Sequence, residues 1–346
     1  MTSPLLLHHQ KLGATLTDER VPTRYGKVEE EYWMVRRNAG IVDLSHLGRL
    51  TVTGRDRASF LNGLLTNDIA SLKENQGLRA CLLTPKARIL ADIHVQNLAD
   101  RMLLDTGQSP ARRVKDTLDQ FIISEDVKVE DSTDQALLLS VQGPAAGEKI
   151  NRVLRIDVSA LKPLETTAVG PSLIIRRDRT GQGGYDIIVP RNEVEPVWQA
   201  FLLDGVTPVG TEALEILRIE AGQPKYGTDF DETTLVLEAG LKDAISFNKG
   251  CYMGQEVVAR ATFIGRVNRR LVQLRAKSSH SIPMPAKIYG DDNKEAGLVT
   301  SLAYSPAMSS VVCFGYVSKD FAKEGVNLEI ITGQDEHLSA TVSHLS

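Results

Sequence analysis

The stretch KGCYMGQE, residues 249–256, is the most specific segment of this 346-residue chain and the one from which its fold is inferred. Two glycines surround a thiol and a phenol, and glycine permits a tight turn or a close backbone approach to a ligand. If a helix begins at Gly254 or Gln255, Cys251 lies just outside its N-terminus, where the helix dipole and Lys249 favour the thiolate. The segment therefore predicts a reactive Cys251 or, equally, a small inert cysteine packed at a turn.

The overall composition is that of a globular protein with a sizeable core. Hydrophobic residues make up 42% of the chain, and its length favours two or three domains. Forty Lys plus Arg against forty-four Asp plus Glu leave a formal net charge of only -4. Such a chain has no bulk cationic field for nucleic acid, so we expect no direct nucleic-acid partner, and any anionic ligand must be held by a local cluster.

The cysteines and apolar runs exclude several other classes of protein. Cys81, Cys251 and Cys313 lie far apart, without the spacings of zinc or iron–sulfur ligands, so we expect neither a disulfide framework nor a metal site. The apolar runs are much shorter than the roughly 20 residues that span a membrane. The first apolar patch has no basic segment before it, which is unlike a secretory signal. We therefore expect a cytoplasmic protein with no membrane association.

Hydrophobic periodicity predicts two αβ modules in tandem, followed by a different kind of domain. The first module has helical patterns and strands up to a hairpin at Thr84-Pro85-Lys86, and the second has strands on either side of the glycine-rich turn at 179–184. From about residue 270, six short apolar stretches separated by turn residues predict a small β-barrel. We place the domains at 1–140, 141–268 and 269–346.

The stretch KGCYMGQEVVAR resembles the K-G-C-[FY]-x-G-Q-E signature of the YgfZ family, which is related to the glycine-cleavage T-protein. The stretches at 39–54, 60–68, 217–241 and 295–306 resemble parts of the aminomethyltransferase fold. This resemblance implies an α+β fold, a T-protein-like three-domain ring in which two αβ modules surround a central folate channel, with a small C-terminal β-barrel. It also implies tetrahydrofolate or a one-carbon derivative as the cofactor.

Asp92 is the leading candidate for an acid that handles protons. It lies in an apolar strand pattern with Leu90 on its own face and Ala91 on the other, and burial would raise its pKa. The alternative is an exposed strand position. The resemblance implies that Asp92 occupies the place of the T-protein acid beside the reactive folate nitrogens. T-proteins have paired Asp residues there, whereas this chain has Ala91-Asp92, which puts full aminomethyl transfer in doubt.

Three further residues are candidates for binding folate. Asp186, after the glycine-rich turn, could accept two N–H groups of a pterin, or it could be an ordinary polar residue of a strand. T-proteins use Glu in the segment similar to RTGYTGEDGFEI. The resemblance implies that Arg218 lies near the folate carboxylates, unless it pairs on a helix surface, and Tyr226 could stack on the ligand or pack in a turn. Arg79 replaces the Tyr of many T-proteins.

Two other groups of polar residues have simpler interpretations. His46 is more often structural than catalytic in such a setting, and its spacing from Asp43 and Ser45 does not establish a hydrolase triad. A basic cluster follows the signature and favours a solvated face, a polyglutamate site or a docking patch. Its members are Arg260, Arg266, Arg269 and Arg270.

From these residues we predict a tetrahydrofolate-binding protein that supports maturation or repair of iron–sulfur proteins, and indirectly tRNA modification, with Cys251 as the functional thiol. Its partners would be iron–sulfur enzymes or assembly factors. Whether it catalyses one-carbon transfer is left open. The first alternative is an aminomethyltransferase of the glycine cleavage system that uses Asp92, and the second is a noncatalytic folate-responsive scaffold. In the signature, Lys249, Gly250, Tyr252, Gly254, Gln255 and Glu256 accompany the thiol.

Overall fold

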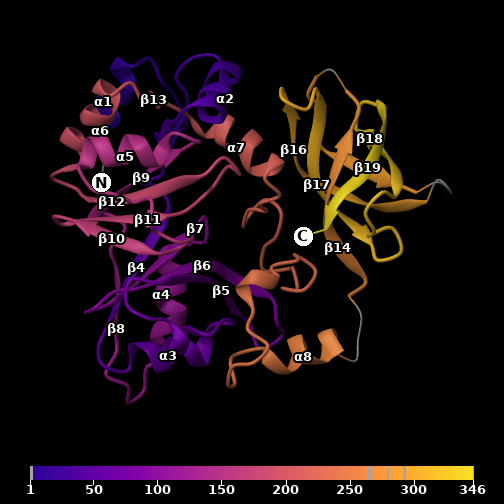
Figure 1. The fold of residues 1–346 in the computed structure, drawn as a ribbon. Coiled ribbons are helices and arrows are strands. Elements are labelled where there is room, and N and C mark those ends of the chain that lie inside the picture. Colours follow the sequence, from indigo (N-terminus) through magenta and orange to yellow (C-terminus); the bar gives the residue numbers. More distant parts are fainter. Residues whose placement is uncertain (1–2, 264–266, 279, 291–293, 346) are drawn as a thin grey trace. The chain divides into compact units, whose positions relative to one another are not determined.

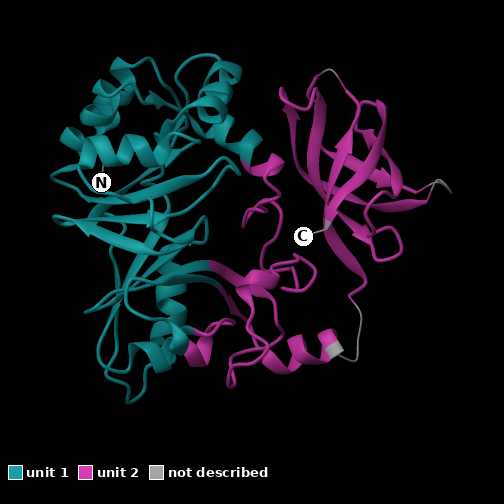
Figure 2. Cartoon of the chain, in the orientation of Figure 1, with its two compact units in different colours: residues 1–61, 69–79, 93–217 teal, residues 62–68, 80–92, 218–346 magenta. Residues whose placement is uncertain are grey.

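The computed structural model describes residues 3–263, 267–278, 280–290 and 294–345. The chain forms two compact units, each assembled from separate segments (Figure 2). Unit 1 contains residues 1–61, 69–79 and 93–217, and unit 2 contains residues 62–68, 80–92 and 218–346. Because the chain passes between the units several times, residues near in sequence can belong to different units.

A six-stranded sheet forms one layer of unit 1 (Figure 1). Its order is β10 (Thr166–Val169), β11 (Ser172–Arg176), β12 (Gly184–Pro190), β9 (Ala136–Gln142), β3 (Gly40–Asp43) and β13 (Thr207–Pro208). Only the pairing of β13 with β3 is parallel. Since β3 comes from the first 50 residues of the chain, the two αβ modules interleave along the sequence.

Helices α5 (Ala146–Leu154) and α6 (Val194–Leu203) pack on one face of this sheet. Alternate strand residues, such as Leu139 and Ile187, pack with Trp198 of α6 in a dry core. The residues between them in sequence point to the opposite face, as the two-residue period of a strand requires. On that face, Leu138 and Ile188 pack with residues of α2 (Val28–Arg37) and of α7 (Thr211–Glu220).

The second sheet has five strands and supplies the other half of the site described below. Its order is β5 (Gly77–Leu83), β6 (Ile89–Asn97), β7 (Met102–Gly107), β4 (Gly48–Thr53) and β8 (Lys128–Asp131). Helix α4 (Ala111–Asp119) contacts β4 and β8, and α3 (Arg57–Leu64) follows β4 in the chain. The short elements α1 (Leu6–Lys11), β1 (Thr15–Leu16) and β2 (Pro22–Arg24) precede α2.

A closed six-stranded barrel dominates unit 2. Its strands are β14 (Arg269–Ala276), β15 (Ala286–Tyr289), β16 (Glu295–Ser305), β17 (Ser310–Ser318), β18 (Asn327–Thr332) and β19 (His337–Leu345). The six apolar stretches of the sequence are these six strands, so the predicted barrel and the α+β fold class are confirmed. Inward side chains such as Val272, Cys313 and Ile330 fill it, which leaves Cys313 as a core residue. Helix α8 (Gln255–Phe263) lies before the barrel in the chain.

Trp198 tests the assigned core of unit 1. Its side chain is fully buried beneath the six-stranded sheet, whereas Leu203 of the same helix is 90% exposed. We expect Trp198→Ala to lower the free energy of unfolding by about 3–5 kcal/mol, because a large cavity replaces the indole. Leu203→Ala should change it by less than about 0.5 kcal/mol. Urea denaturation of both variants checks the pair, and equal effects would mean that α6 is packed differently.

Candidate functional site

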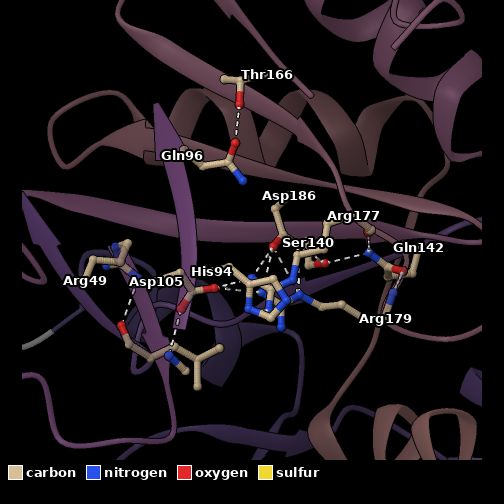
Figure 3. A network of polar contacts seen from close by, with 12 residues as sticks. Arg49, His94, Gln96, Asp105, Ser140, Gln142, Thr166, Arg177, Arg179 and Asp186 are labelled. Carbon is tan, nitrogen blue, oxygen red and sulfur yellow. Dashed lines mark hydrogen bonds and ion pairs between the residues drawn. The ribbon is translucent and has the colours of Figure 1, made fainter. Parts of the chain in front are cut away.

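Two cross-strand polar pairs of unit 1 come together, one from the six-stranded sheet and one from the five-stranded sheet. Asp186 on β12 lies directly opposite Ser140 on β9, on the face turned away from α5 and α6. His94 on β6 lies directly opposite Asp105 on β7. The side chains of these residues converge in Figure 3. Sheet register therefore fixes the backbone positions of these four polar residues, whatever rotamers their side chains adopt.

Two arginines at the end of β11 join these pairs (Figure 3). Arg179 donates to Oδ1 of Asp186 through Nε at 2.9 Å and to Oδ2 through Nη2 at 2.6 Å, a two-pronged contact. Arg177 donates to Asp105 through Nη1 and to Nδ1 of His94 through Nη2 at 3.0 Å. The Nη1 of Arg177 also lies 3.5 Å from Oδ2 of Asp186. The two guanidiniums thus connect the two sheets.

Gln142 holds the strand end from which both arginines project. Its Oε1 accepts from the backbone N–H of Arg179 at 2.8 Å, and its Nε2 donates to Ser140 Oγ at 2.8 Å and to the carbonyl of Arg177 at 3.0 Å. A Cβ on Gly184 would lie 2.2 Å from Oε1 of Gln142. Glycine at position 184 is therefore required for the carboxamide to occupy this place.

Asp178 shapes the turn that follows. Its carboxylate accepts from the backbone N–H groups of Thr180 at 2.9 Å, Gly181 at 2.8 Å and Gly183 at 3.0 Å. Gly181 and Gly183 both have positive φ, which suits glycine. The sequence RDRTGQGG thus encodes a rigid turn that orients Arg179.

The network balances two carboxylates against two guanidiniums. Burial acts to raise the pKa of Asp105, but Arg177 and Arg179 outweigh it and hold that pKa well below its usual range. Burial, with Arg177 as the next cause, holds the pKa of His94 well below 6.5. His94 is therefore neutral at pH 7, and since arginine only donates, Nδ1 accepts and the ring proton lies on Nε2.

The carboxylate of Asp186 is already engaged by the protein. Ser140 donates to Oδ1 at 2.7 Å, and Arg179 donates to both oxygens. The cavity beside it, which His94 also lines, has a volume of about 10 Å³, room for about one water molecule. A direct contact between Asp186 and a pterin would require Arg179 to move, so pterin binding by Asp186 stays a prediction.

Asp92 lies on β6 as the alternation of the sequence predicts. The burial pattern of this strand places Ala91 and Ile93 in the core and Asp92 on the half-buried face with Leu90 and His94. The carboxylate is thus partly accessible and follows the same face as the network histidine, two residues along the strand. This position is compatible with proton handling.

Arg218 lies at the end of α7 in unit 2 and is held by the protein itself. Its Nη1 donates to Oδ2 of Asp229 at 2.7 Å and to the carbonyl of Gln223 at 3.0 Å. The other oxygen of Asp229 accepts from the hydroxyls of Thr300 at 2.7 Å and Ser301 at 2.6 Å on barrel strand β16. Arg218 therefore links the end of α7 to the barrel, and its predicted contact with folate carboxylates stays a prediction.

Tyr226 is half-buried and packs in a turn of unit 2. Its ring lies edge-on to that of Phe230, with 5.9 Å between centroids. The packed-turn interpretation of this residue therefore has structural support, and ligand stacking by Tyr226 stays a prediction.

The signature segment is anchored in unit 2 mainly by its lysine. The Nζ of Lys249 donates to the carbonyls of Asn62 at 2.5 Å, Leu65 at 2.7 Å and Asn67 at 2.8 Å, which lie at and beyond the end of α3. Burial lowers the pKa of Lys249 to about 8. Lysine thus serves as a cap for backbone carbonyls that a helix end leaves unpaired.

The other residues of the segment place one cysteine at the surface. Tyr252 is buried in a cluster with Cys81, and Gly254 has φ +83° and approaches the Thr84 carbonyl closely. Helix α8 begins at Gln255, which confirms the expected helix start, and Glu256 is exposed in its first turn. Cys251 is exposed, whereas the other two cysteines are buried. Burial of Cys251, which the inert alternative expected, is therefore wrong, and the reactivity of its thiol stays a prediction.

The triad suggested by composition does not form. Asp43 accepts from the hydroxyl of Ser45 at 2.5 Å and pairs with Nε2 of His9 at 2.9 Å, while His46 is exposed. His9 in turn contacts the hydroxyl of Tyr25 at 2.7 Å through Nδ1. This buried chain secures α1, and because serine bonds the carboxylate rather than the imidazole, it is not a nucleophile–base pair.

In the basic cluster, Arg260, Arg269 and Arg270 are exposed, and Arg266 lies outside the described residues. Arg269 pairs with Glu238 at 3.2 Å and stacks over the ring of Tyr316 at 4.5 Å. At least one member of the cluster thus serves the packing of unit 2.

Comparison with known proteins gives matches along the whole chain. Residues 8–249 match the model described as GCVT N-terminal domain, and residues 269–346 match the glycine cleavage T-protein C-terminal barrel domain. An aminomethyltransferase of Streptomyces avermitilis is 32% identical over 92% of this chain and 89% of its own length. One of Thermosipho melanesiensis is 29% identical over 95% and 92%.

A solved structure gives the same result. The glycine cleavage system aminomethyltransferase T of Bartonella henselae has a TM-score of 0.93 at 26% identity and covers 100% of this chain and 97% of its own. These matches support the T-protein relationship and not the YgfZ assignment. The predicted role in iron–sulfur maturation, with its iron–sulfur partners and link to tRNA modification, is wrong, because the matched relatives are named aminomethyltransferase.

No helix within the described residues is long and apolar enough to cross a membrane. No group of three or more His, Cys, Asp or Glu residues within them is arranged to hold a metal ion.

Asp105→Asn tests the electrostatic role of the network. The change leaves Arg177 buried without its main partner, so we expect a loss of about 3–5 kcal/mol in the free energy of unfolding at pH 7. The folded-state pKa of Asp105 is depressed, so its contribution is present above about pH 4 and lost as the pH falls further. The variant should therefore lose less stability than wild type below pH 4.

Chemical denaturation between pH 2 and 7 measures both effects. Asp116→Asn, on the exposed side of α4, is the matched control and should change stability little. If Asp105→Asn behaved like this control at pH 7, the network would not bear on the stability of unit 1.

Lys249→Met tests the anchoring of the signature segment. Three backbone carbonyls lose their charged donor, and we expect a cost of about 1–3 kcal/mol in the free energy of unfolding. Hydrogen exchange at residues 62–68 should become faster. Lys242→Met, at an exposed position of the same unit, is the control. Unchanged exchange in Lys249→Met would refute the capping role.

Proposed function

The chain belongs to the glycine cleavage T-protein family, and we propose that it is an aminomethyltransferase, which transfers the aminomethyl carbon from a lipoyl carrier to tetrahydrofolate. The observation that carries the proposal is the match of both T-protein domains along one chain, with a TM-score of 0.93 to a solved aminomethyltransferase. The likeness covers 100% of this chain and 97% of the chain of that solved structure.

Asp92 is the residue that we propose to handle the proton. Tetrahydrofolate supplies the acceptor nitrogens when it is bound, and a half-buried carboxylate on a strand is suited to hold or move a proton there. A position that is neither fully buried nor fully exposed lets the group meet a ligand and yet be shielded from bulk water. The proposed role of Asp92 therefore depends on its position on the half-buried face of β6, the face that also carries His94.

T-proteins have an Asp at the position of Ala91, but this replacement removes no carboxylate from the face of β6 on which Asp92 lies. Neighbouring strand residues point to opposite faces, and Ala91 is fully buried in the core. A carboxylate at position 91 would project into that core rather than beside Asp92. The departure that the sequence comparison raised against transfer is thus less serious than it seemed from the motif alone.

The remaining candidates form the proposed folate contacts and a separate thiol. Asp186, Arg218 and Tyr226 supply a carboxylate, a guanidinium and a phenol, which are groups that suit a pterin with a carboxylate tail. The donor set fits folate by its chemistry, although Asp186 and Arg218 each have a protein partner that a ligand would have to share. Exposed Cys251 remains a proposed functional thiol.

Reconstitution of glycine cleavage tests the proposal. We expect turnover with an aminomethylated lipoyl carrier and tetrahydrofolate, and a decrease in kcat of about 100-fold or more for Asp92→Asn, the range that a general acid or base contributes. Asp100→Asn, in the exposed turn between β6 and β7, is the matched control and should turn over like wild type. Cys251→Ser in the same assay decides whether the thiol takes part.

Failure of wild type to release ammonia and form the methylene folate would overturn the proposal. Equal rates for Asp92→Asn and wild type would leave the transfer standing but remove Asp92 from it.

A further inference from the structure

The Nε2–H group of His94 is a hydrogen-bond donor that the protein itself does not use. Arg177 donates to Nδ1 of this ring at 3.0 Å, which leaves the ring proton on Nε2. Within the described residues Nε2 has no hydrogen-bond partner. The buried polar atoms that lack a partner there belong to other residues, so Nε2 keeps contact with solvent. The N–H group is therefore accessible to a ligand.

The orientation and the charge of this imidazole are both fixed by Arg177. The Nη2 of Arg177 donates to the ring, while its Nη1 donates to Asp105, which lies directly opposite His94 in the sheet. Burial and the charge of Arg177 hold the pKa of His94 well below 6.5, so the ring is neutral at pH 7. A neutral donor with a fixed tautomer suits a neutral acceptor such as a carbonyl oxygen.

His94 and Asp92 lie on the accessible part of one face of β6. Both are half-buried, as is Leu90 before them. Gln96, the next residue on this face, is only 3% exposed and accepts from the hydroxyl of Thr166 at 2.8 Å. A ligand on this face can thus reach as far as His94. Because alternate residues of a strand lie about 7 Å apart, a ligand that meets Asp92 also comes within reach of His94.

We propose that His94 donates from Nε2 to the 4-oxo group of the pterin ring of tetrahydrofolate and selects this group over a 4-amino group. The inference rests on the proposed function, in which Asp92 handles a proton at an acceptor nitrogen of folate. The 4-oxo oxygen and N5, one of those nitrogens, are neighbours on the same edge of the pterin. An acid and a neutral donor on one strand face match that edge.

The selection follows from the direction of the hydrogen bond. A 4-amino group presents N–H bonds where the 4-oxo group presents lone pairs. The fixed Nε2–H of His94 would then face another donor, and both groups would lose an acceptor. Because Arg177 occupies Nδ1, the ring cannot exchange its tautomer to accommodate the amino group.

Anaerobic calorimetry with tetrahydrofolate and with its 4-amino analogue, tetrahydroaminopterin, tests the proposal. Wild type should bind the analogue at least about tenfold more weakly, because its site is built around an acceptor that the analogue lacks. In His94→Leu the two dissociation constants should agree within about threefold. His94→Gln should restore most of the preference, since a carboxamide can accept from Arg177 and donate to the ligand.

The ratio of the two affinities separates loss of the donor from damage to the network, which would weaken both ligands alike. His337→Leu, at a half-exposed position of β19 in unit 2, is the matched control and should keep the wild-type ratio. Long-range ¹H–¹⁵N spectra of wild type give a second measurement. The Nε2 signal of His94, assigned by its loss in His94→Gln, should show the Nε2–H tautomer and shift when tetrahydrofolate binds. If His94→Leu does not fold, the wild-type ratio and these spectra decide.

Equal affinity of wild type for the two ligands would overturn the role of His94, as would a preference that survives in folded His94→Leu. The proposed function would stand in both cases, because tetrahydrofolate still binds. An Nε2 signal that does not move on saturation with tetrahydrofolate would refute the hydrogen bond in the same way. If wild type bound neither ligand, the proposed function would fall, and the role of His94 with it.

Discussion

The pairing of Arg177 and Arg179 with Asp105 and Asp186 is the interaction on which unit 1 depends most. These charges lie between two sheets, where an unpaired ion would cost several kcal/mol. Each carboxylate has a position fixed by strand register, and each arginine leaves the same strand end. The network therefore specifies how the sheets face each other, whereas the apolar clusters on either side specify only that they pack.

The network also explains the protonation state of His94 and the position of Gln142. His94 stays neutral because Arg177 lies beside it in a buried site, and Gln142 can brace the arginines only because position 184 is glycine. Asp92 precedes His94 by two residues on the same half-buried face of β6. The strand thus carries a histidine bound by the network and the proposed acid on one face.

Much of the fold could be predicted from sequence periodicity, whereas the protein partners of the site residues could not. Six short apolar stretches gave the six barrel strands, and alternation around Asp92 gave its face correctly. Asp186 also looked like a ligand-binding acid, because the sequence does not reveal that Arg179 folds back onto it across a glycine-rich turn. The pairing of Arg218 with Asp229 could not be foreseen for the same reason, since Asp229 lies beyond another turn. The eight-residue signature favoured a thiol function, yet three of its residues, Lys249, Tyr252 and Gly254, hold the chain in place.

The central claim is that this T-protein fold binds tetrahydrofolate as the acceptor of an aminomethyl carbon. Anaerobic calorimetric titration of the wild-type chain with tetrahydrofolate tests that claim most directly, because it requires no carrier protein and no assumption about Asp92. The account predicts saturable binding with one folate per chain. Heats that stay at the level of dilution would contradict it, and would mean that the chain has kept the fold of the family without its cofactor.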